Sequence, residues 1–158
     1  MKTKPSFKIL NLPSFSVVGK LTSTKEGPGS IERAWNEAEN QLKIVSSSVL
    51  FIGCMPSFWG LMSDFSLSFA PWENDFKEGL YLAGFELKDP SFVPPEGWVK
   101  WDVKENRYLV YEVGEDYQTS FKEGLDCLKN EGYVLSGAAF DHLENGVSYI
   151  YYPIEISA

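Results

Sequence analysis

The feature that most constrains this fold is an order of sequence patterns that occurs once in each half of the chain. In the first half, VVGKLTSTKEGPGSIERAWNEAENQ runs from an apolar strand pattern through a turn into a helical pattern. In the second half, YLVYEVGEDYQTSFKEGLDCLKNEG has the same layout with little identity. Each helical pattern is followed by two more strand patterns, the last being YLAGFEL in one half and YIYYPIEI in the other. An internal repeat of this size predicts two similar units that share one core.

The repeat predicts an α+β fold of duplicated βαββ units with pseudo-two-fold symmetry. We expect the units to span about residues 7–88 and 97–157, joined by the proline-rich linker DPSFVPPEG. An antiparallel sheet with helices on one side would leave a central ligand cleft where the units meet. A length of 158 residues fits a single domain over residues 1–158.

Local patterns in the first unit indicate where its elements begin. Pro13 interrupts the first apolar stretch, which predicts an edge strand or a bend there and a regular strand from Phe15 onward. Ser30 is the predicted N-cap of a helix, and Trp35 lies on the apolar stripe of that helix, which indicates a core position. Residues 49–54 predict a short buried strand.

The second unit has clearer boundaries than the first. Strands are predicted over 79–87 at the end of the first unit and over 107–114 in the second, and the alternating residues 98–103 could pair locally. A helix with an apolar stripe from Tyr117 to Leu128 should follow. The segments LSGAAFDHLE and SYIYYPIEI flank an Asn-Gly pair, which predicts a β-hairpin with a tight turn.

Charge and composition limit the classes of function. The net charge is −8 and the chain has no run of lysine or arginine, so direct binding of nucleic acid is not expected. The N-terminus lacks a signal-peptide pattern and no apolar run could cross a bilayer, which predicts a cytoplasmic protein without membrane contact. His142 is the single histidine, so we expect no multi-histidine metal site and no cofactor.

Many aromatic residues lie in the stretch MPSFWGLMSDFSLSFAPW, residues 55–72, which has neither a helical nor a strand period. We interpret this stretch as a loop. Phe58, Trp59 and Trp72 could wall a cleft, where rings attract flat apolar or cationic ligands. The alternative is a small satellite core beneath a long loop, and the sequence leaves both readings open.

Two of the carboxylates that fall within strand patterns are candidates for the site. Asp141 follows small and apolar residues, where an unpaired carboxylate needs a protein partner, a raised pKa or a cationic ligand. Glu86 occupies the comparable strand of the first half. The alternatives are a hydrated Asp141 at a strand end and an exposed Glu86 beside a turn. Nearby residues complete the predicted ligand-binding set, which comprises Asp141, Glu86, Glu144, Trp59, Trp72, Phe58, Tyr111, Tyr151 and Phe140.

The element order, together with RYLVYEVGEDYQTSFKEGLDCLKNEGYVLSGAAFDHLENGVSYIYYPIEI and the earlier YLAGFEL, resembles the GyrI-like effector-binding domain. That family forms the ligand-sensing part of many AraC-type and MerR-type transcription regulators and also occurs alone. The family pattern G-x-x-F-E-x-Y corresponds here to G-A-A-F-D-H-L, so Asp141 matches the glutamate and Leu143 stands where tyrosine is common. Glu144 could take the role of the glutamate instead.

The resemblance implies a stand-alone protein that binds lipophilic, often aromatic, cations and lacks a DNA-binding domain. Some family members are hydrolases of reactive small molecules, and the namesake inhibits DNA gyrase, so hydrolysis and protein binding are the alternatives. The chain has no G-x-S-x-G elbow, P-loop or G-x-G-x-x-G motif, and we assign no catalytic residue. An exposed edge near Pro13 could pair with a second copy to form a homodimer.

Overall fold

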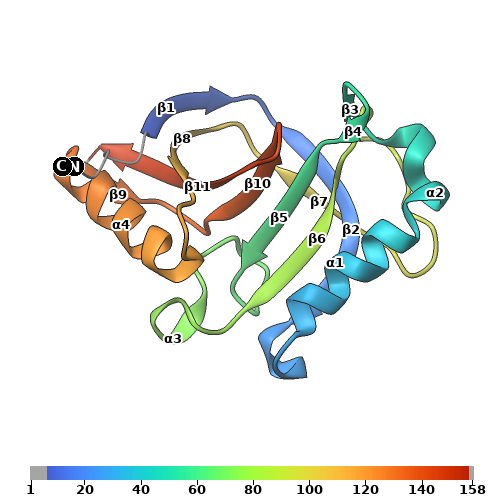
Figure 1. Cartoon of the computed structure of the whole chain (residues 1–158), viewed down its shortest axis with the longest axis horizontal. Coiled ribbons are helices and arrows are strands. Elements are labelled where there is room, and N and C mark those ends of the chain that lie inside the picture. The colour runs from blue at the N-terminus through green and yellow to red at the C-terminus, as the bar shows by residue number, and fades with distance from the viewer. Residues whose placement is uncertain (1–6, 157–158) are drawn as a thin grey trace.

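The computed structural model describes residues 7–156 as an α+β fold built on a curled antiparallel sheet (Figure 1). The strands follow the order β1-β8-β11-β10-β5-β6-β2-β7. The first half of the chain supplies β2 (Phe15–Ser23), β5 (Phe58–Ser63) and β6 (Leu80–Glu86). The second half supplies β8 (Asn106–Glu112), β10 (Phe140–Glu144) and β11 (Val147–Ile156). The halves meet at the antiparallel pair of β5 and β10.

The two outer strands exchange places between the halves. β1 (Phe7–Leu12) precedes β2 in the chain but pairs with β8. β7 (Val99–Val103) precedes β8 but pairs with β2. Each half therefore contains the predicted βαββ order, β2-α1-β5-β6 in the first and β8-α4-β10-β11 in the second, and one further strand precedes it. The expected edge strand at Pro13 is confirmed.

Helices α1 (Ser30–Asn40) and α4 (Tyr117–Asn130) cover the same face of the sheet. Helix α1 packs on β2 and β6, and α4 packs on β8, β11 and the short strand β9 (Tyr133–Leu135). Figure 1 shows the two helices apart, with β5 and β10 running between them. Within residues 7–156, no helix has the length and apolar character needed to span a membrane.

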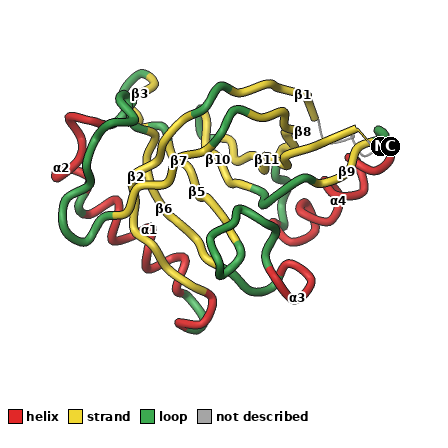
Figure 2. Tube along the Cα trace, turned by 180° about the vertical axis from the view of Figure 1, so that it is seen from behind, coloured by secondary structure: helices red, strands yellow, loops and turns green. Residues whose placement is uncertain are grey.

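The opposite face of the sheet curls around a core rich in aromatic rings. Figure 2 shows the course of the strands from behind. Phe69 enters this core from the loop after β5, and its ring stands edge-on to Trp101 with 5.5 Å between centroids. The backbone N–H of Ala138 donates to the Phe69 carbonyl at 2.8 Å. Further buried members of the core are Val17, Trp59, Leu61, Tyr108, Phe140 and Tyr151.

The ring-rich stretch 55–72 is not one loop, so that interpretation was wrong. Its residues 58–63 form β5, a central strand that is covered on both faces. Phe58 faces α1, and Trp59 faces the curled core. A strand buried on both faces does not alternate between apolar and polar residues, so the sequence did not show the period of two that identifies a strand.

Several predicted boundaries were also wrong. Residues 49–54 do not form a buried strand, because Gly53 turns the chain at a φ of 67° between two very short strands. Gly29, rather than Ser30, is the N-cap of α1. The expected strand LSGAAFDHLE divides into β9 and β10. The remaining short elements are η1 (Thr24–Glu26), α2 (Leu42–Val45), η2 (Ser46–Ser48), β3 (Phe51–Ile52), β4 (Met55–Pro56) and α3 (Glu73–Phe76).

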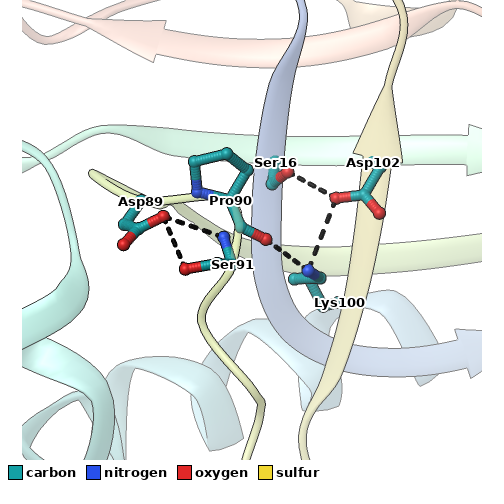
Figure 3. Close-up of polar contacts among 6 residues, drawn as sticks. All are labelled: Ser16, Asp89, Pro90, Ser91, Lys100 and Asp102. Atoms are coloured by element: carbon teal, nitrogen blue, oxygen red, sulfur yellow. Dashed lines mark hydrogen bonds and ion pairs between the residues drawn. The ribbon is translucent and has the colours of Figure 1, made fainter.

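The proline-rich linker is held against the outer strand β7 (Figure 3). The Lys100 ammonium donates to the Pro90 carbonyl and lies 3.7 Å from the Asp102 carboxylate. Ser16 on β2 donates to the same carboxylate, and Asp89 accepts from the backbone N–H of Ser91 at 2.9 Å. These contacts connect the linker, β7 and β2, so the passage between the halves is structured.

Candidate functional site

A cleft of about 440 Å³ lies between α1 and α4. Its floor comes from β5 and β10, and its walls come from α1 on one side and the start of α4 on the other. A volume of this size falls in the range of small-molecule sites. The lining residues are Trp35, Glu39, Phe58, Gly60, Tyr81, Val113, Gly114, Glu115, Tyr117, Asp141, His142, Leu143, Ser148 and Tyr149.

Gly60 lies at the floor of the cleft, where it has no side chain to fill the space above β5. It lies opposite Asp141 on β10 and opposite Ala83 on β6. A Cβ atom at position 60 would lie only 1.8 Å from the hydroxyl oxygen of Tyr81. The absence of a side chain therefore makes room for Tyr81 to reach across the floor to the neighbouring strand.

Asp141 is the carboxylate at the bottom of the cleft. Tyr81 donates to its Oδ2 at 2.8 Å, and Tyr117 donates to its Oδ1 at 2.5 Å. The indole N–H of Trp35 donates to the Tyr81 hydroxyl at 3.2 Å, which leaves the Tyr81 proton free to point at Asp141. These four side chains form a hydrogen-bonded chain from α1 across the sheet to α4.

The electrostatics follow from burial. Burial raises the pKa of Asp141 to about 6, and the hydrogen bonds from Tyr117 and Tyr81 partly oppose that rise. Burial, together with the nearby carboxylate, raises the pKa of both tyrosines well above the usual value. At neutral pH the tyrosines are therefore neutral donors and Asp141 is mostly ionised. Asp141 keeps some accessible surface because it opens into the cleft.

The cleft also presents accessible rings. Tyr117 is 38% exposed, so one side of its ring remains available while its hydroxyl is held beside Asp141. Trp35 and Phe58 are half-buried on the other side, with 6.1 Å between their ring centroids. A carboxylate between exposed ring faces suits a ligand that is both flat and positively charged.

Two of the predicted ligand-binding residues, Asp141 and Phe58, line this cleft. Glu86 lies on the opposite face of the sheet, where its Oε1 accepts from the Trp59 indole N–H at 3.0 Å and from the Ser57 hydroxyl at 3.1 Å. Glu144 is two residues beyond His142 on β10, on the same side as that ring and away from Asp141.

The other predicted rings are placed in the core. Trp59 stacks on His142 with 3.9 Å between centroids. The Trp72 indole N–H donates to the Leu80 carbonyl at 2.9 Å, and the Tyr111 hydroxyl donates to Glu123 at 3.0 Å. Phe140 and Tyr151 are buried in the curled core. None of these five rings lines the α1–α4 cleft.

Sequence reasoning missed Trp35, Tyr81 and Tyr117 as site residues. Trp35 and Tyr117 lie on apolar helical stripes. Trp35 packs against the core as predicted, and it also lines the cleft. One signal was available: the polar atom of a packed tryptophan or tyrosine usually needs a partner. A stripe that contains such rings indicates that a polar group lies opposite.

Comparison with known proteins places the fold. No family model matches the sequence, and a search of curated proteins finds no match. The structure superimposes on the EcmrR C-terminal domain with a TM-score of 0.69 and 9% identity, covering 98% of this chain and 99% of that domain. It also superimposes on SAV2435 bound to tetraphenylphosphonium with a TM-score of 0.61 and 12% identity, covering 95% of this chain and 94% of SAV2435.

A third similar structure is a hydrolase from Listeria innocua. The TM-score is 0.54 with 10% identity, covering 98% of this chain and 94% of the hydrolase. Identities this low show a shared fold and leave the activity of this chain open. The chain therefore shares its α+β fold with the EcmrR C-terminal domain, SAV2435 and the hydrolase from Listeria innocua.

Proposed function

We propose that the chain is a single GyrI-like effector-binding domain that holds a lipophilic aromatic cation in the α1–α4 cleft. The observation that carries the proposal is the Asp141 carboxylate at the floor of an accessible cleft with aromatic walls. A cation there would gain Coulomb attraction from Asp141 and about 0.5–2 kcal/mol from a well-placed ring. The fold similarity to SAV2435 bound to tetraphenylphosphonium supports a ligand of this class.

Binding should be measured by calorimetry with two probes of the same shape and opposite charge. Tetraphenylphosphonium should bind, and tetraphenylborate should bind far more weakly. Asp141→Asn should reduce affinity for the cation by about 10- to 100-fold, because it removes the charge on the floor. Glu86→Gln is the matched control: it removes a carboxylate from the opposite face and should leave affinity unchanged. Equal affinity for both probes, or no effect of Asp141→Asn, would contradict the proposal.

Hydrolysis of a reactive small molecule is the second candidate function. One observation favours it: a carboxylate with a pKa near 6 lies between two tyrosine hydroxyls, an arrangement suited to general acid–base chemistry. Incubation with an electrophilic alkylating agent distinguishes the two functions. Product beyond one equivalent that disappears in Asp141→Asn would establish turnover, whereas stoichiometric or absent product would leave binding as the function.

A further inference from the structure

The carboxylates of the cleft lie at two depths. Asp141 lies on the floor, where both of its oxygens accept tyrosine hydrogen bonds. Glu39 on α1 and Glu115 just before α4 are both exposed, and they belong to the two opposite walls. The cleft therefore has one enclosed negative charge and two solvated negative charges.

The two wall glutamates have no cationic partner among the residues that the structure describes. The ion pairs found within residues 7–156 join Lys20 to Glu37 and Lys100 to Asp102, and the cleft lining contains no lysine or arginine. Glu37 lies two residues before Glu39 on α1, outside the cleft lining, and its ion pair with Lys20 shows that a carboxylate on this helix can be paired. Glu39 and Glu115 instead leave their charge available at the cleft.

A compact ligand with one charge uses only the floor. Its cationic centre would lie over Asp141, enclosed by the rings of Trp35, Phe58 and Tyr117. A second charge at that depth would be costly, because burying an ion without its own partner carries a desolvation penalty of several kcal/mol. At the rim a second charge keeps most of its hydration and still meets two carboxylates of opposite sign.

We propose that the cleft prefers elongated dications, with one lipophilic cationic centre over Asp141 and a second cationic group at the rim between Glu39 and Glu115. This inference rests on the proposed binding of cations and narrows the class of ligand. It assigns Glu39 and Glu115 as specificity-determining residues that act on the distal charge alone.

The experiment uses two triphenylphosphonium probes that carry the same alkyl chain. In one the chain ends in trimethylammonium, and in the other it ends in tert-butyl, which has the same shape and no charge. Each is titrated into the wild-type chain, Glu39→Gln, Glu115→Gln and the double variant. Glu105→Gln, an exposed position in the turn after β7 and outside the cleft lining, is the matched control for net charge.

The wild-type chain should bind the dication more tightly than the tert-butyl probe. Each glutamine substitution in the cleft should weaken dication binding by about two- to fivefold, the size expected for exposed charge pairs, and leave the tert-butyl probe unaffected. Glu105→Gln should change neither affinity. Added salt should diminish the dication's advantage, since exposed charges are screened.

The outcomes separate this inference from the function on which it rests. If the dication has no advantage, or if Glu105→Gln lowers it as much as the cleft substitutions do, the rim site is overturned while binding over Asp141 stands. If the tert-butyl probe binds equally well to wild-type chain and Asp141→Asn, the floor assignment fails. If neither probe binds the wild-type chain, both proposals are overturned.

Discussion

Burial of the Asp141 carboxylate destabilises the folded protein. Its pKa is raised to about 6 from the ordinary value of 3.8, because the folded chain removes its carboxylate from water. A rise of about two pH units corresponds to about 3 kcal/mol of destabilisation once the group is ionised in both states. A positive ligand of the proposed class would offset this cost when it binds.

The stability of the folded chain should depend on pH through Asp141. Between about pH 4 and pH 6 the folded chain binds more protons at Asp141 than the unfolded chain does, so the free energy of unfolding should fall as pH rises through this window. Asp141→Asn should remove that fall and be more stable than wild type at pH 7 by about 1–3 kcal/mol. Urea unfolding at several pH values measures both effects.

The control for this prediction is Asp126→Asn, at an exposed position on α4 outside the cleft. It should retain the wild-type slope between pH 4 and pH 6. An Asp141→Asn variant less stable than wild type at pH 7 would indicate that the hydrogen bonds from Tyr81 and Tyr117 outweigh the effect of burial.

At the scale of single residues, the sequence identified the charge of the site and missed its partners. Asp141 could be predicted because a carboxylate among small and apolar residues on a strand requires an explanation. Tyr81 and Tyr117 could not, because their roles depend on which strand and which helix face Asp141. The strand that contains Glu86 was predicted correctly. The direction of the Glu86 side chain was not, because only the strand register shows that it points to the face opposite the cleft.

At the scale of elements, α4 contains a glycine in its interior that packing explains. A Cβ atom on Gly124 would lie 2.4 Å from the hydroxyl oxygen of Tyr152. That hydroxyl donates to the Phe121 carbonyl at 2.7 Å, and Tyr152 is fully buried. The helix therefore approaches β11 closely only because position 124 has no side chain.

Gly124→Ala should destabilise the chain even though alanine favours helices by about 1 kcal/mol over glycine. The clash with a fully buried tyrosine should cost more than this gain, giving a net loss of about 1–2 kcal/mol. Thermal unfolding measures the change. Asn36→Ala, at an exposed position of α1, should be neutral or stabilising, and a stabilised Gly124→Ala would show that α4 can move away from the sheet.

Most elements could be predicted from local patterns, and the failures have physical causes. The hairpin at Asn145-Gly146 is confirmed, with φ of 51° and 78° at the two turn residues. β5 was hidden because it is buried on both faces, so its rings gave no alternating period. Residues 49–54 looked like a strand because they are apolar, although Phe51 and Ile52 are exposed in the structure.

At the scale of the whole molecule, the exchange of β1 and β7 binds the two halves together. Each outer strand lies beside β8 or β2 of the half that it does not precede in the chain, and β5 pairs with β10 at the centre. Neither half contains all the strands of its own part of the sheet. The repeat was visible in the sequence, but the exchange was not, because strand patterns do not specify partners.

This arrangement predicts a single cooperative unfolding transition. Tryptophan emission reports on the first half and on β7 beside it, while far-ultraviolet circular dichroism also reports on α4 in the second half. The two signals should give coincident urea transitions. An earlier loss of either signal would mean that the halves unfold separately and that the exchanged strands do not couple them.

The proposed function requires Asp141 to be the counter-charge for a bound cation. The most direct measurement is an NMR titration of the Asp141 side-chain carboxyl carbon, with and without saturating tetraphenylphosphonium. We expect a pKa near 6 in the free chain and a clear fall on saturation, because a positive neighbour favours the ionised form. An unchanged pKa on saturation, or a free-chain value near the ordinary 3.8, would contradict it.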